Sequence, residues 1–85
     1  MKFLEAARTV FESKTAMLIR PRKGADREYD LKPMFSGKKS GWVLMDLFTA
    51  SAVVAVADRV AEDVKLILNS LPPVKAAAIC MKAVS

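Results

Sequence analysis

The segment that most constrains the fold runs from Thr49 to Leu71 and reads TASAVVAVADRVAEDVKLILNSL. Its apolar residues recur at alternating spacings of four and three: Val53, Ala57, Val60, Val64, Ile67 and Leu71. This rhythm places all of them on one face of an α-helix. We therefore expect a long central helix over residues 49–71, with Thr49 as its N-cap. The Pro72-Pro73 step should end the helix, because a residue before proline disfavours helical backbone.

The two sides of this predicted helix differ in character. Charged residues gather on the side opposite the apolar face: Asp58, Arg59, Glu62, Asp63 and Lys65. Spacings of three and four among them favour a solvated face with ion pairs. The first half, residues 50–57, is apolar nearly all round, so it should be buried on more than one side or meet a partner. A homodimer through the helix 50–71 is the alternative to an ordinary core helix, and Ala52, Val54, Val56 and Ala61 would widen its seam.

Length and composition indicate a single domain over residues 1–85 in a soluble protein. Of the 85 residues, 53% are apolar, which suffices for a core, and the single Cys80 excludes an internal disulfide. Small secreted domains usually rely on disulfides, so we expect a reducing, cytoplasmic location. The N-terminus lacks the apolar core of a signal peptide, and the longest uncharged run, 47–57, is too short to span a bilayer. We expect no membrane contact.

The remaining elements are shorter. Residues 2–12 show the pattern of an amphipathic helix, and residues 15–33 that of a β-hairpin region around a Lys23–Asp26 turn. Residues 15–20 could instead extend the first helix, and residues 42–48 are either a third strand or an approach to the main helix. A short C-terminal helix should begin at Pro73.

The predicted fold class is thus α+β and mostly helical: an N-terminal helix, a small β-hairpin region, a long central helix and a short C-terminal helix. An all-α bundle is the alternative. The expected core consists of the following residues: Phe3, Val10, Phe11, Leu18, Trp42, Leu44, Leu47, Val53, Val60, Val64, Ile67 and Met81.

No catalytic, metal or cofactor motif is assembled in the sequence. The loop SGKKSG fails the phosphate-binding pattern, because Lys39 stands where Ser or Thr is needed and Lys32 where the first Gly is needed. The chain has no histidine, so it lacks imidazole ligands and the usual base for a Cys80 nucleophile. We expect a buried Cys80 thiol, a protein that is not an enzyme, no cofactor and no metal.

Positive charge is concentrated between residues 20 and 39. This segment carries a net charge of +4, out of +5 for the whole chain. Lys and Arg side chains displace condensed counterions from nucleic acids, and Tyr29, Phe35 and Trp42 are interleaved with them as candidates for base stacking. The candidate residues for binding a partner or a nucleic acid are Arg20, Arg22, Lys23, Arg27, Lys38 and Lys39.

The C-terminal half, FTASAVVAVADRV followed by LNSLPPVKAAAICMKAV, resembles small accessory proteins encoded by bacteriophages. Such proteins pair an alanine-rich helix with a short tail helix after a Leu-Pro step. The resemblance implies a protein that binds a host protein or nucleic-acid machine and inhibits or redirects it. The excess of apolar helix surface and the lack of a catalytic constellation make a small basic, non-enzymatic module for protein–protein interaction the leading hypothesis. The alternative is a nucleic-acid-binding protein that uses residues 20–39.

Overall fold

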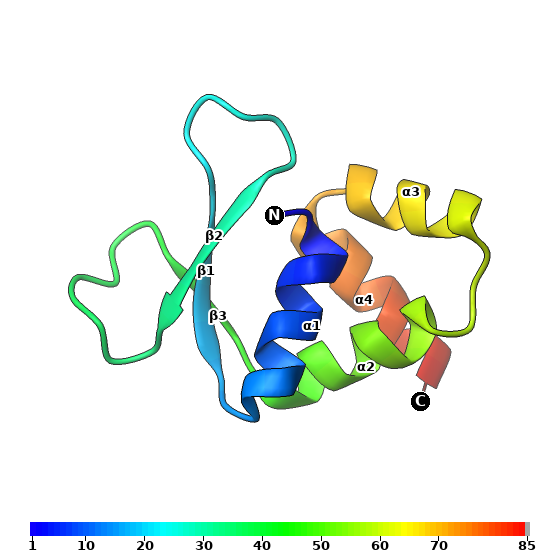
Figure 1. The fold of residues 1–85 in the computed structure, drawn as a ribbon, viewed down its shortest axis with the longest axis horizontal. Helices are drawn as coiled ribbons and strands as arrows, with labels where there is room; N and C mark the ends of the chain where they lie inside the picture. The colour runs from blue at the N-terminus through cyan, green and yellow to red at the C-terminus, as the bar shows by residue number, and fades with distance from the viewer. Residues whose placement is uncertain (85) are drawn as a thin grey trace.

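The computed structural model describes residues 1–84, which form a helical layer and a small antiparallel sheet (Figure 1). The helices are α1 (Phe3–Ser13), α2 (Leu47–Ala57), α3 (Glu62–Ser70) and α4 (Pro73–Val84). The strands are β1 (Met17–Pro21), β2 (Tyr29–Pro33) and β3 (Val43–Met45). The α+β, mostly helical prediction is confirmed. The hairpin and the helix from Pro73 are also as predicted, whereas residues 42–48 contain both a strand and the start of α2.

Helix α1 lies between the sheet and the other helices (Figure 1). Its buried face consists of Phe3, Ala6, Ala7 and Val10, and it contacts α2, α3 and β2. Three of these four residues are small or β-branched, so neighbouring backbones can approach α1 closely. The N-terminal helix therefore occupies the centre that the sequence pattern assigns to residues 49–71.

The sheet has the order β2-β1-β3, and both outer strands run antiparallel to β1. Because side chains alternate between the two faces of a strand, Ile19, Tyr29 and Met45 point into the core beside α1. Arg20 and its partner Asp30 point to the other face. All four helices lie on the α1 side of the sheet (Figure 1), so this second face, which we call the outer face, has no helix over it.

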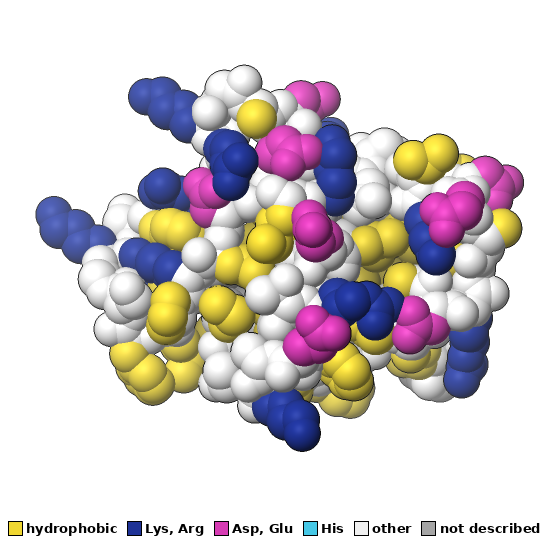
Figure 2. Space-filling view, in the orientation of Figure 1, with side chains coloured by type: hydrophobic (Ala, Val, Ile, Leu, Met, Phe, Trp, Pro, Cys, Tyr) yellow, Lys and Arg dark blue, Asp and Glu magenta, His cyan; other side chains and the backbone are white. Residues whose placement is uncertain are grey.

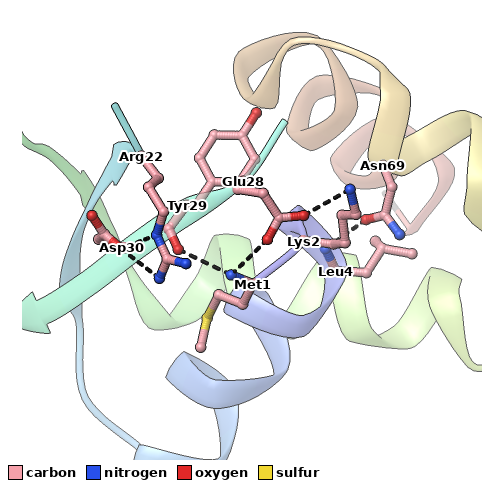
Figure 3. A network of polar contacts seen from close by, with 8 residues as sticks. All are labelled: Met1, Lys2, Leu4, Arg22, Glu28, Tyr29, Asp30 and Asn69. Carbon is pink, nitrogen blue, oxygen red and sulfur yellow. Dashed lines mark hydrogen bonds and ion pairs between the residues drawn. The ribbon is translucent and has the colours of Figure 1, made fainter. Parts of the chain in front are cut away.

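A network of polar contacts joins the start of α1 to β2 and α3 (Figure 3). The Tyr29 N–H donates to the Met1 carbonyl at 2.8 Å, and the Leu4 N–H donates to Asn69 Oδ1 at 2.9 Å. The first contact occupies the Tyr29 N–H at the free edge of β2. The N–H groups of a strand point alternately to its two sides, so Pro33 faces the same free edge as Tyr29, and proline has no N–H. The edge of β2 is therefore a poor place for an additional strand.

The prediction of one helix over 49–71 is wrong. The segment forms α2 and α3, separated at residues 58–61, where Ala61 has extended backbone (φ −72°, ψ 164°). The predicted N-cap is also wrong: α2 begins at Leu47, and the Asp46 carboxylate accepts the Thr49 N–H at 2.7 Å.

Packing on α1 explains the break. A continuous helix of this length would be about 34 Å long, whereas α1 is only about 16 Å long, so the second half would extend past it. The break lets both α2 and α3 contact α1. Glu62 and Asp63 lie in the first turn of α3, where carboxylates stabilise the positive end of the helix dipole.

The break also changes which residues form the core. Of the predicted core residues, Phe3, Val10, Leu18 and Val53 are buried, and Trp42, Val60 and Met81 are partly buried. The prediction is wrong for five exposed residues, namely Phe11, Leu44, Leu47, Val64 and Ile67. The apolar first half of the segment is buried as expected, since Ala52 and Val54 lie inside the protomer. These two residues are therefore not free to widen a dimer seam.

Two adjacent residues of α3 test which face of this segment is buried. Leu68 is 3% exposed and Ile67 is 56% exposed, although the periodic pattern assigns Ile67 to the core. We expect Leu68→Ala to lower the free energy of unfolding by about 2–5 kcal/mol, because it leaves a cavity. Ile67→Ala should change it by no more than about 0.5 kcal/mol. Urea denaturation followed by circular dichroism measures both, and equal losses would support the continuous helix instead.

The Asp46 cap makes a second prediction. The hydrogen bond from the Thr49 N–H favours the ionised carboxylate and lowers the pKa of Asp46. Its stabilisation is present above the ordinary pKa of Asp, about 4, and is lost as the pH falls through the lowered value. Asp46→Ala should cost about 0.5–2 kcal/mol at neutral pH. The difference between wild type and Asp46→Ala should shrink in urea denaturation near pH 2, and a constant difference would contradict the cap.

Candidate interaction surface

The outer face of the sheet carries most of the basic segment. Arg20 and Arg22 extend from β1, Lys32 from β2, and Trp42 lies just before β3. Since β2 and β3 both run antiparallel to β1, the connection 34–42 returns along the sheet from one edge to the other. It passes on the side away from α1 (Figure 1). We call the outer face and this crossing loop together the basic face.

Trp42 organises the cations of the basic face. The Arg20 guanidinium carbon lies 4.4 Å from the centroid of the Trp42 ring, and Lys32 Nζ lies 4.5 Å from it. Both distances are within the range of cation–π attraction. Leu18 pairs with Lys32 and is only 4% exposed although no helix covers it. Trp42 and the crossing loop therefore take the place of a helix over this part of the sheet.

The acidic residues of the segment do not all lie on the basic face. Glu28 pairs with Lys2 at 2.7 Å, which lowers the pKa of Glu28 and raises the pKa of Lys2. Asp26 lies near the same lysine. Asp30 alone of the three is on the outer face, where it pairs with Arg22 at 2.9 Å (Figure 3). It also approaches Arg20 at 3.8 Å.

The crossing loop is tied to the sheet and presents an exposed aromatic ring. Lys32 Nζ donates to the Lys38 carbonyl, and the Trp42 N–H donates to the Lys39 carbonyl at 3.0 Å. Lys39 Nζ lies 5.8 Å from the centre of the Phe35 ring, which is 84% exposed. Lys and Arg side chains lie along the upper and outer side of this part of the molecule, and apolar side chains lie below them (Figure 2).

The structure brings together four of the six predicted binding residues. Arg20 and Arg22 lie on the outer face, and Lys38 and Lys39 lie on the loop that crosses it. The other two are not part of this group. Lys23 is in the exposed hairpin turn. Arg27 has left-handed backbone (φ 57°) and lines a hollow beside Lys2.

Of the interleaved aromatics, Tyr29 is not a stacking residue. It is 2% exposed and makes an edge-to-face contact with Phe3 at 6.4 Å between ring centroids. Lys32 was missed as a member of the site, although the hairpin register that pairs it with Leu18 places it on the face of Arg20. Counting alternate residues back from the turn would have found it.

A second surface is apolar and lies where α1 ends and α2 begins. Phe11, Leu47 and Phe48 line an open groove of about 670 Å³ together with Glu12, Lys14 and Ser51. Phe48 is 69% exposed and also borders a smaller hollow with Ala55 and Val84. This apolar groove is a continuous surface along α2, with Phe48 standing between its two hollows.

The other side chains that could be considered for catalysis form ion pairs or are buried. Asp58 pairs with Arg8 of α1, and Glu62 pairs with Lys65 at 3.1 Å. Cys80 is buried as predicted, and its burial raises the pKa of the thiol, which disfavours the nucleophilic thiolate.

Comparison of the chain with protein-family models, with curated proteins and with solved structures found no match in any of the three. Among residues 1–84, no helix has the length and apolar character needed to cross a membrane.

Proposed function

We propose that this chain is a small, non-enzymatic interaction module that binds a protein partner through the apolar groove of α1 and α2. In this proposal it is an accessory protein of the phage type, and its partner is a protein component of a host macromolecular machine that it inhibits or redirects. The observation that supports the proposal most strongly is the exposure of Phe48 beside Phe11 and Leu47.

The exposure of Phe48 is informative because several other residues of α2 are buried, whereas this larger aromatic side chain is not. Asp46 fixes the residue at which α2 begins by accepting the Thr49 N–H. The packing of α2 on α1 and α4 buries Ala50, Val53 and Ala57 and leaves Phe48 outside. Large aromatic side chains near the centre of an apolar surface are the usual energetic anchors of protein interfaces.

The groove has charged residues at its rim. Glu12 and Lys14 flank Phe11 at the end of α1, and the floor between Leu47 and Phe48 is apolar. An apolar centre with a polar rim is the arrangement of a protein-binding surface. A second copy of this chain is the other occupant that such a surface could accept, and the oligomeric state distinguishes the two.

Phe48→Asp tests the proposal. The side chain is mostly exposed, so the substitution should leave the unfolding midpoint almost unchanged. Affinity capture from nuclease-treated host extract should retain a defined protein with the wild type and lose it with Phe48→Asp. The matched control is Val74→Asp on α4, which changes a residue that is 79% exposed and lies outside the groove.

The captured protein must then bind the purified wild-type chain directly, with Phe48→Asp weakening the affinity at least about tenfold and Val74→Asp leaving it unchanged. Equal binding by all three proteins would contradict a role for the groove. If light scattering shows a dimer that Phe48→Asp converts to a monomer, the groove holds a second copy rather than a different partner.

A further inference from the structure

Phe35 is the most exposed large apolar side chain of residues 1–84. Neither core packing nor solubility explains its position. It lies in the crossing loop with its ring at 84% exposure, close to Lys39 Nζ. Single exposed apolar side chains are common on protein surfaces, so the significance of this ring rests on its place beside Lys39 on a basic surface. The loop that carries it is anchored to the sheet through Lys32 and Trp42.

A hollow of about 350 Å³ adjoins Phe35. It is lined by Met17, Pro33 and Met34, and by Ser13, Thr15 and Ala16 at or just after the end of α1. Met17 and Pro33 have the register of Ile19, so they belong to the inner face of the sheet. The hollow is therefore separate from the basic face, and Phe35 of the crossing loop borders both.

The charges of the basic face match a phosphate backbone. Arg20, Arg22, Lys32, Lys38 and Lys39 oppose the single carboxylate of Asp30, so the basic face has a net charge of +4 out of +5 for the chain. Trp42 holds Arg20 and Lys32 at about the same distance from its ring, which limits their rotamers before any ligand arrives. Cations fixed in advance lose less entropy on binding.

We infer that the basic face binds single-stranded nucleic acid, with one base stacked on Phe35 and the flanking phosphates contacted by Lys38, Lys39 and Arg20. The inference goes beyond the proposed function, because it concerns a different surface and a different class of partner. Paired bases in a duplex are stacked on one another and offer no free face to Phe35. An acidic peptide would supply carboxylates but no flat ring for Phe35.

Fluorescence anisotropy with a labelled thymidine oligonucleotide of about 12 nucleotides, at about 50 mM salt, tests the inference. Phe35→Leu keeps the apolar bulk but removes the aromatic face, so binding should weaken about tenfold. Phe35→Trp keeps the face and should bind like the wild type. A uridine oligoribonucleotide in a parallel titration determines whether DNA or RNA is preferred.

Charge is tested separately with Lys38→Ala/Lys39→Ala. Each lost phosphate contact should reduce the magnitude of the log–log salt slope by about 0.7 for a single strand. Lys75→Ala, an exposed lysine on α4, is the control and should leave the affinity and slope unchanged. All variants alter exposed side chains, so thermal unfolding should confirm that they remain folded.

Four results would overturn the inference. The first is no binding of either oligonucleotide at about 50 mM salt. The second is equal affinity of wild type and Phe35→Leu. The third is equally tight binding of a duplex of the same length. The fourth is competition by poly-glutamate as effective as by unlabelled oligonucleotide. These results leave the proposal for the apolar groove untouched, because Phe48 lies outside the basic face.

Discussion

The burial of α1 on two sides is the constraint on which the rest of the structure depends. Its face of Phe3, Ala6, Ala7 and Val10 must be covered, and a helix of this length needs neighbours of similar length to cover it. Helix α2 covers one side, the inner face of the sheet covers another, and α3 turns back to cover the N-terminal end through Leu68 and Asn69. The interruption at residues 58–61 follows from this demand.

Helices α2 and α3 pack on α1, and α4 packs on α2 and α3, so helices cover only one face of the sheet. The outer face must then protect Leu18 by other means, and Trp42 with the crossing loop does so. This solution brings cations and an exposed Phe35 onto one surface. The apolar groove begins where β3 leads into α2. Leu44 of β3 lies on the outer face, and Leu47, three residues later, lines the groove. The two surfaces that we propose as binding sites are thus joined by this short segment.

The sequence predicted the fold class, the hairpin and the first and last helices, because each has a local signal in apolar period or proline position. It did not predict the break near Val60, because no glycine or proline marks it and the cause is the short length of a distant helix. The paired acids Glu62 and Asp63 were a usable signal for a new helix start, but their spacing also fits an ion-paired face.

The candidate site was predictable in part for similar reasons. A cluster of basic residues is visible in the sequence, so Arg20, Arg22, Lys38 and Lys39, which the structure places on one face, could be named as candidates. Which acidic residues neutralise this cluster depends on the tertiary structure. Glu28 forms an ion pair with Lys2, and Asp30 forms one with Arg22. The exposure of Phe35 and Phe48 could not be read from composition, because aromatic residues in a small chain are usually needed for the core.

Native-state amide hydrogen exchange tests the central claim, that the fold is built around α1 with the chain interrupted between α2 and α3. The account predicts the slowest exchange in α1, at Ala7 and Val10, and in the middle of α2. It predicts fast exchange at Val60 and Ala61, which lie between the two helices. Uninterrupted protection from residue 50 to residue 70, with α1 exchanging faster than that segment, would contradict it.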